Sequence, residues 1–234
     1  MAIPFDSFTL AASTATLAEE PAARANADCV EFRMDLAADP LDALEAYGGE
    51  LPLLVTNRAE WEGGKAGDDG RFETLDLAIE HDAVGAVDLE LASLDGERGS
   101  EETERARRLA ERASEMNVSV VVSAHDFERT PTKSDLVATL RRASEYGDVA
   151  KFAVTALDRG DALSLLSATY ELTEEGHSVA TMAMGEAGSH TRAVAPVYGS
   201  KIGYAPIDPT KATAPGQYDL ETLRRLVTEL VTSR

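Results

Sequence analysis

The feature of this sequence that most constrains its fold is the alternation of short apolar runs with segments of helical periodicity. The apolar runs are rich in β-branched residues and have the length of buried strands. We expect strands over residues 8–12, 29–33, 53–56, 84–91, 118–123, 149–154, 178–182 and 201–203. The segments between and after them predict helices over residues 14–26, 40–47, 71–82, 101–116, 133–146, 159–174, 189–195 and 217–232.

Eight strand–helix units within 234 residues predict a (β/α)8 TIM barrel, an α/β fold. An open doubly wound sheet is the alternative, and it fits this number of units less well. Both folds have parallel strands joined by right-handed crossovers. The sequence contains no Pro/Gly/Ser-rich linker, low-complexity segment or internal repeat. We therefore expect residues 1–234 to form one domain.

The charge balance excludes some functions and suggests an environment. Asp and Glu number 42 against 22 Lys and Arg, which gives a formal net charge of −20. Nucleic-acid binding relies on clustered basic side chains, so we expect no nucleic-acid partner. Only five of the basic residues are lysines. An acidic, lysine-poor surface suits a high-salt cytoplasm, where repulsion between carboxylates is screened within about 3 Å at 1 M salt. We expect a halophilic protein, with an ordinary acidic protein as the alternative.

Other sequence signals concern compartment and metal binding. No apolar run approaches the length of a membrane span, and residues 1–10 lack the pattern of a secretory signal. We expect a cytoplasmic protein without membrane contact. The lone cysteine, Cys29, lies in an apolar run and is typical of a core residue. The four histidines show no metal-ligand spacing, so we expect no metal.

Polar residues close nearly every predicted strand, which is where a βα barrel builds its active site. Lys151 stands out because it lies inside the apolar run 149–154. Burial disfavours an ammonium ion and so favours an amine that attacks a carbonyl. The alternative is a structural lysine, snorkelling or paired with Glu90 or Asp88.

Two further groups of strand-end residues suggest chemistry. His125 alone among the histidines ends a strand, so it is either a general acid/base or a capping residue. Three guanidinium groups also lie at strand ends, and together they would bind a small carboxylate. The alternative is a structural ring of ion pairs. This hypothesis places Arg33, Arg58 and Arg192 against Glu31, Glu62 and Glu90.

These residues belong to motifs that follow one another at successive strand ends. In this order the motifs resemble those of the type I 3-dehydroquinate dehydratases, over most of the chain. They are Glu31-Phe32-Arg33, Arg58 with Glu62-Gly63-Gly64, Ser123-Ala124-His125-Asp126-Phe127 with Thr130-Pro131, Lys151, Met182-Ala183-Met184-Gly185 with Arg192, and Ala214-Pro215-Gly216-Gln217.

The resemblance implies a Schiff-base enzyme of the shikimate pathway, a hydro-lyase that converts 3-dehydroquinate to 3-dehydroshikimate without a cofactor. It implies that Lys151 forms the imine, that His125 is the general acid/base of a syn elimination, and that Glu62 orients His125. It implies a homodimer. It also implies that the barrel lacks the N-terminal hairpin of bacterial relatives, so another element must close the barrel floor. Substrate contacts are implied for Glu31, Arg33, Arg58, Met184, Arg192, Tyr198, Thr213 and Gln217.

Two rival functions remain open at this point. Another class I Schiff-base lyase or aldolase would share Lys151, but it gives no account of His125 together with Gln217. A non-catalytic protein that binds small carboxylates would use the arginines alone. In such a protein, replacing Lys151 or His125 would leave ligand binding unchanged.

Overall fold

The sheet consists of eight parallel strands whose spatial order follows the sequence. The computed structural model describes residues 2–208, 210 and 216–232. Within these residues the strands are hydrogen-bonded in the order β7-β6-β5-β4-β3-β2-β1-β8. They are β1 (Thr9–Thr14), β2 (Cys29–Arg33), β3 (Leu53–Thr56), β4 (Val84–Glu90), β5 (Ser119–Asp126), β6 (Val149–Thr155), β7 (Val179–Met184) and β8 (Ile202–Pro206).

The sheet closes into a barrel at the junction of β7 and β8. The first strand pairs with both β2 and β8, which an open doubly wound sheet does not do. At the junction, the Lys201 N–H donates to the Val179 carbonyl at 2.7 Å, and the Thr181 N–H donates to Ser200 Oγ at 3.1 Å. The predicted (β/α)8 barrel is therefore confirmed. The junction of β7 and β8 is held by these hydrogen bonds and not by a regular strand ladder.

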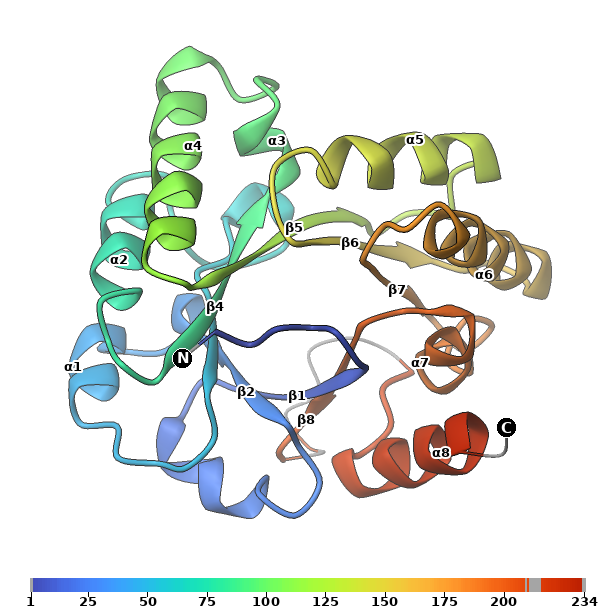
Figure 1. Cartoon of the computed structure of the whole chain (residues 1–234), viewed down its shortest axis with the longest axis horizontal. Helices are drawn as coiled ribbons and strands as arrows, with labels where there is room; N and C mark the ends of the chain where they lie inside the picture. Colours follow the sequence, from blue (N-terminus) through green and yellow to red (C-terminus); the bar gives the residue numbers. More distant parts are fainter. Residues whose placement is uncertain (1, 209, 211–215, 233–234) are drawn as a thin grey trace.

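The helices surround the ring of strands (Figure 1). Short 3-10 helices, labelled η, accompany the α-helices in several of the connections. The α-helices are α1 (Pro40–Glu45), α2 (Arg71–Ala78), α3 (Leu91–Leu94), α4 (Ser100–Glu115), α5 (Lys133–Ala143), α6 (Arg159–Glu174), α7 (Thr191–Val194) and α8 (Leu220–Thr232), and the 3-10 helices are η1 (Leu17–Ala22), η2 (Met34–Leu36), η3 (Glu60–Glu62) and η4 (Ala195–Tyr198).

One predicted helix is confirmed and another is wrong, and residues within each segment explain the outcome. The helix over residues 159–174 is confirmed, and its N-cap Asp158 accepts a hydrogen bond from the Asp161 N–H. The α-helix expected over residues 14–26 is wrong, because only the 3-10 helix η1 forms there. Pro21 lies inside that segment and supplies no backbone N–H for a continuing helix.

The N-terminal segment closes the bottom of the barrel. Ile3 and Phe5 are buried in the interior cluster, which also contains residues of most strands. The Ile3 N–H donates to the Gly85 carbonyl at 3.0 Å, and Ser119 Oγ donates to the Ile3 carbonyl at 2.8 Å. This segment, dark blue in Figure 1, crosses the barrel before entering β1. It is the covering element that the sequence required.

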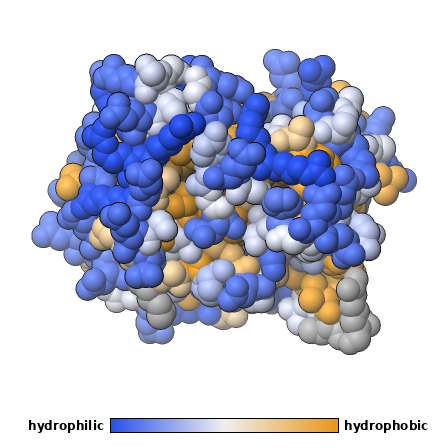
Figure 2. Space-filling model, turned by 45° about the horizontal axis from the view of Figure 1, so that its top comes forward, coloured by the Kyte–Doolittle hydropathy of each residue, from blue (hydrophilic) through white to orange (hydrophobic). Residues whose placement is uncertain are grey.

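The outer surface follows the acidic composition. Hydrophilic residues predominate on the face shown in Figure 2. On α4, acidic and basic side chains pair four residues apart along the exposed face, as in Arg105 with Glu101 and Arg108 with Glu104. The opposite face of the same helix buries Ala106, Leu109 and Ala113 against the sheet, as its periodicity predicts.

Candidate active site

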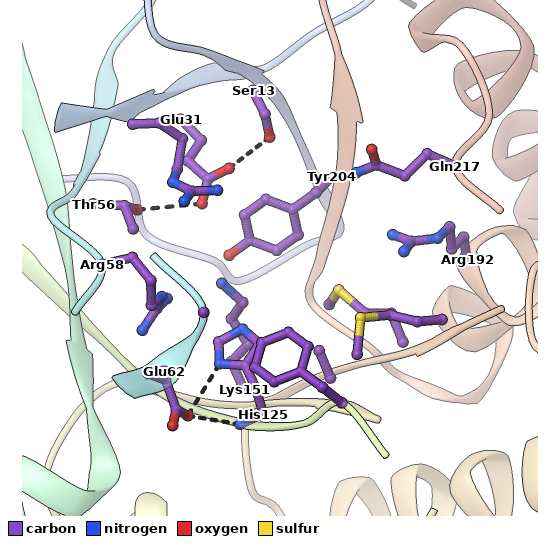
Figure 3. A pocket seen from close by; sticks show the side chains of 16 residues that line it. Ser13, Glu31, Thr56, Arg58, Glu62, His125, Lys151, Arg192, Tyr204 and Gln217 are labelled. Atoms are coloured by element: carbon purple, nitrogen blue, oxygen red, sulfur yellow. Dashed lines mark hydrogen bonds and ion pairs between the residues drawn. The ribbon is translucent and has the colours of Figure 1, made fainter. Parts of the chain in front are cut away.

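A pocket lies at the carboxyl ends of the strands, and most of the predicted site residues line it (Figure 3). Every strand except β4 contributes a lining residue from the strand itself or from the loop after it. The lining residues are Ser13, Glu31, Arg33, Thr56, Arg58, Glu62, Gly63, His125, Phe127, Lys151, Ala153, Met182, Met184, Arg192, Tyr204 and Gln217.

Lys151 lies on β6 and faces the pocket. It is only 5% exposed, and its Nζ donates to Asp88 Oδ2 at 3.0 Å. The same nitrogen lies 4.4 Å from the centre of the Tyr204 ring. The structural ion pair with Asp88 therefore exists, and it holds the amine inside the pocket. The two interpretations of Lys151 are compatible, since an ion-paired lysine at this place is also available to a ligand.

Asp88 on β4 is the centre of a buried polar network. Its Oδ1 accepts hydrogen bonds from Arg58 Nη2 at 2.8 Å and from Ser123 Oγ at 2.6 Å. Burial alone would raise the pKa of Asp88, but the Arg58 and Lys151 cations hold that pKa well below its usual range. Asp88 is therefore ionised, and it balances the charge of the lysine.

The network continues away from the pocket. Glu90 accepts hydrogen bonds from Arg58 at 3.0 Å and from Arg71 at 2.5 Å, and Arg71 is itself fully buried. The guanidinium carbon of Arg71 lies 4.2 Å from the centre of the Phe72 ring. Arg58 is thus fixed by two carboxylates on β4. Arg58 therefore forms structural ion pairs, which was the alternative considered for the three arginines, and it also lines the pocket.

His125 and Glu62 form a hydrogen-bonded pair at the mouth of the pocket (Figure 3). Glu62 Oε1 lies 3.1 Å from His125 Nδ1 and accepts the His125 backbone N–H at 2.8 Å. Burial lowers the pKa of His125 well below its ordinary value, with the Arg58 and Lys151 charges acting in the same direction. Burial raises the pKa of Glu62 to about 7. The imidazole is therefore neutral at pH 7, which suits a base.

Glycines allow the loop that carries Glu62 to approach β3 and β5. A Cβ on Gly64 would lie 2.0 Å from the Arg58 carbonyl oxygen, and a Cβ on Gly63 would lie 2.5 Å from the Phe127 ring. Gly63 also has a φ of +80°, which favours glycine. The Phe127 ring in turn stacks on the His125 ring, with centroids 5.6 Å apart. The sequence motif thus sets the position of Glu62 and the orientation of His125.

The three predicted arginines differ in their partners. Arg33 makes two hydrogen bonds to Asp35, at 2.8 and 2.7 Å, and Arg58 is bound by the β4 carboxylates. Arg192 is 5% exposed, and among residues 2–208, 210 and 216–232 it forms no ion pair and its Nε has no hydrogen-bond partner. Burial lowers the pKa of Arg192 to about 10. An unpaired buried cation of this kind is a ready site for a carboxylate.

Local packing fixes the position of Arg192. The adjacent Thr191 is fully buried, and its Oγ1 accepts the Ala183 N–H at 2.9 Å and donates to the Gly188 carbonyl at 2.7 Å. These bonds attach the start of α7 to the end of β7. Arg192 consequently lines the pocket beside Met182 and Met184, which are also buried.

The remaining predicted residues divide into those within the pocket and those elsewhere. Glu31 is in the pocket, where it accepts hydrogen bonds from Ser13 at 2.5 Å and Thr56 at 3.2 Å. Gln217 also lines the pocket, whereas Thr213 lies outside the described residues. Tyr198 was expected in the pocket wall, and that expectation is wrong. It lies on η4, is 39% exposed and packs edge-on against Tyr170 of α6.

Sequence reasoning missed a different tyrosine, Tyr204. The expected strand over residues 201–203 stops before it, but β8 continues to Pro206 and directs Tyr204 into the pocket. Thr56, at the end of β3, was also missed as a site residue, whereas the family resemblance already implied a serine of the first strand, with Ser13 as the candidate, and Ser13 lines the pocket. The position of Thr56 at the end of a strand was the signal that could have found it.

The comparison with known families agrees with the geometry of this pocket. Residues 8–233 match the model of the family described as type I 3-dehydroquinase. The chain belongs to the type I 3-dehydroquinase family. It is 58% identical over 227 residues to the 3-dehydroquinate dehydratase of Haloarcula marismortui, with 97% of each chain covered. It is 50% identical over 230 residues to that of Halobacterium salinarum, covering 97% of this chain and 99% of the relative.

Solved structures of the type I 3-dehydroquinase family are similar to this chain over nearly its whole length. The 3-dehydroquinate dehydratase of Geobacillus kaustophilus superposes with a TM-score of 0.83 at 31% identity, covering 98% of this chain and 93% of the other. The type I enzyme of Clostridium difficile, solved with covalent modified comenic acid, gives a TM-score of 0.83 at 26% identity, covering 97% and 94%.

The described residues contain neither a cluster of metal ligands nor a helix suited to a membrane span. Among residues 2–208, 210 and 216–232 there is no group of three or more His, Cys, Asp or Glu side chains that could hold a metal ion. Within the same residues, no helix combines the length and the apolar character that a membrane span needs.

Proposed function

We propose that this protein dehydrates 3-dehydroquinate to 3-dehydroshikimate through a Schiff base on Lys151, in the shikimate pathway. The observation that carries the proposal is the arrangement around Lys151. The buried amine shares one pocket with the neutral imidazole of His125, which is hydrogen-bonded to Glu62, and with the Arg192 cation, which has no ion-pair partner among the described residues. Membership of the type I 3-dehydroquinase family supports the same reaction.

The first steps form the imine. Nζ of Lys151 attacks the C3 carbonyl of the substrate, and the resulting carbinolamine loses water to give an iminium ion. Asp88, whose Oδ2 lies 3.0 Å from Nζ, is placed to balance the positive charge of that iminium. The iminium withdraws electrons from C2 and so acidifies the proton there.

His125 performs the elimination. With Nδ1–H donating to Glu62, the lone pair of Nε2 is free to remove the C2 proton. The same nitrogen returns a proton to the C1 hydroxyl, which leaves as water. Hydrolysis of the imine then releases the product and restores the Lys151 amine. One molecule of water is lost overall.

Charge complementarity orients the substrate. Arg192 is the group best placed to bind the carboxylate, because it has no anionic partner within the described residues. Glu31, Arg33 and Arg58 would bind the substrate hydroxyls, and Gln217 and Met184 complete the wall. Residue Thr213, expected from the family resemblance to contact substrate, stays a prediction.

Borohydride trapping tests the proposal. The protein is incubated with 3-dehydroquinate in molar KCl, reduced, digested and analysed by mass spectrometry for the modified lysine. We expect a substrate- or product-derived mass on Lys151 and almost no turnover in Lys151→Ala. Full turnover in that variant, or no adduct on a folded wild-type protein, would contradict the mechanism. Cleavage of a carbon–carbon bond would instead identify an aldolase, and binding without turnover a carboxylate-binding protein.

Three further properties are part of the proposal. The high net negative charge and the relatives in Haloarcula and Halobacterium support a halophilic protein of the cytoplasm. The family resemblance supports a homodimer. We also propose that the single (β/α)8 unit, residues 1–234, carries the whole activity.

A further inference from the structure

Tyr204 has a buried hydroxyl group that the described structure leaves without a partner. The side chain projects from β8 into the pocket, and the residue is 5% exposed (Figure 3). Among residues 2–208, 210 and 216–232, no atom forms a hydrogen bond with its Oη. Buried hydroxyl groups in folded proteins nearly always have a partner, so this exception requires an explanation.

The groups that face the hydroxyl are already engaged in other hydrogen bonds. Figure 3 shows the Tyr204 Oη directed toward the side of the pocket that contains Glu31 and Arg58. Glu31 uses one oxygen for Ser13 and the other for Thr56. Arg58 is held by the carboxylates of β4. The polar groups that the hydroxyl faces therefore already have hydrogen-bond partners of their own.

The ring of Tyr204 lies next to the reactive nitrogen of the proposed mechanism. Lys151 Nζ is 4.4 Å from the ring centre, within the range of a cation–π contact. A substrate bonded to Nζ must therefore lie against this ring. Burial raises the pKa of Tyr204 well above its ordinary value, so the hydroxyl remains a neutral donor at any working pH.

A phenylalanine would fill the same space without burying an unpaired polar group. The hydroxyl is thus a cost to the ligand-free protein, of the kind found where a ligand supplies the missing partner. Building on the proposed function, we infer that Tyr204 is a further catalytic residue. Its hydroxyl donates a hydrogen bond to an oxygen of the cyclic, polyhydroxylated keto acid bound at Lys151, and its ring faces the cationic lysine nitrogen.

The test compares Tyr204→Phe with Tyr198→Phe in molar KCl. Both variants lose one tyrosine hydroxyl, but Tyr198 lies on the surface outside the pocket. For each protein we would measure kcat, KM, the yield of borohydride adduct on Lys151 and the ligand-free melting temperature. For Tyr204→Phe we expect kcat/KM to fall about tenfold, as for the loss of one hydrogen bond, with a melting temperature equal to or above that of the wild type. Tyr198→Phe should match the wild type in kcat/KM.

The outcomes separate this inference from the proposed function. A wild type with turnover and adduct, together with a Tyr204→Phe variant whose kcat/KM is within twofold, overturns the inference alone. A fall in kcat/KM that comes with a lower melting temperature also overturns it, because the hydroxyl would then have a structural partner. A wild type with neither turnover nor adduct removes the proposed function and this inference with it.

Discussion

The replacement Arg192→Met should stabilise the ligand-free protein while it abolishes efficient catalysis. Arg192 is 5% exposed and has no carboxylate partner within the described residues. Burial lowers the pKa of Arg192 to about 10, which corresponds to a cost of about 3 kcal/mol for keeping the charge in the folded state. Methionine fills a similar volume without charge. We expect a gain of about 1 to 3 kcal/mol, or roughly 2–10 °C in melting temperature.

The same variant should lose its carboxylate site. Removing a buried guanidinium that binds a carboxylate costs at least about 2 to 3 kcal/mol of binding, so kcat/KM should fall about 100-fold or more. Turnover can be followed by the ultraviolet absorbance of the conjugated product. Thermal unfolding of the ligand-free protein in molar KCl gives the stability.

Arg33→Met is the matched control. Arg33 also lines the pocket, but its two hydrogen bonds go to Asp35, whose side chain is buried. Removing Arg33 leaves that carboxylate unpaired, so this variant should lose about 2 kcal/mol or more of stability. The two arginine variants should therefore shift the melting temperature in opposite directions. A loss of stability in Arg192→Met as large as in Arg33→Met would refute the interpretation of Arg192 as an unpaired cation.

Two other predictions concern pH and salt. Burial raises the pKa of Glu62 from 4.5 to about 7, so the folded state favours its protonated form. Compared with Glu62→Gln, the wild type should lose about 2 to 3 kcal/mol of unfolding free energy as the pH rises from 4.5 through 7. Below pH 4.5 the unfolding free energies of the two proteins should converge. Parallel curves of unfolding free energy against pH would contradict this prediction. Because the net charge is −20, the melting temperature of the wild type should rise steeply from dilute buffer to molar KCl, and a salt-independent value would argue against a halophilic protein.

Much of the fold follows from local patterns in the sequence. The strands over residues 29–33 and 53–56 were predicted with the bounds that the structure shows, because their apolar runs end abruptly in polar residues. In a parallel barrel all carboxyl ends of the strands point to one face. The alternation of strands and helices was therefore sufficient to predict that Lys151 and His125 share one site.

Strand register was not available from the sequence. β8 is short and contains glycine, and its apolar pattern does not show where the strand ends. Only pairing with β1, in which Tyr204 lies opposite Ala11, determines that Tyr204 points into the pocket. The family resemblance implied Tyr198 there instead, and the sequence does not reveal that Tyr198, on η4, packs against α6.

The charge partners of the arginines were also decided by the tertiary structure. Arg33, Arg58 and Arg192 look equivalent in the sequence, since each follows or ends an apolar run. Arg33 pairs locally with Asp35, two residues along the chain, whereas folding brings two carboxylates of β4 to Arg58 and, among the described residues, none to Arg192. The sequence by itself determined which residue types gather at the mouth of the barrel. Which carboxylates reach Arg58, and whether any of the described ones reaches Arg192, depends on distances of a few ångströms between segments far apart in the sequence, and only the folded chain sets those distances.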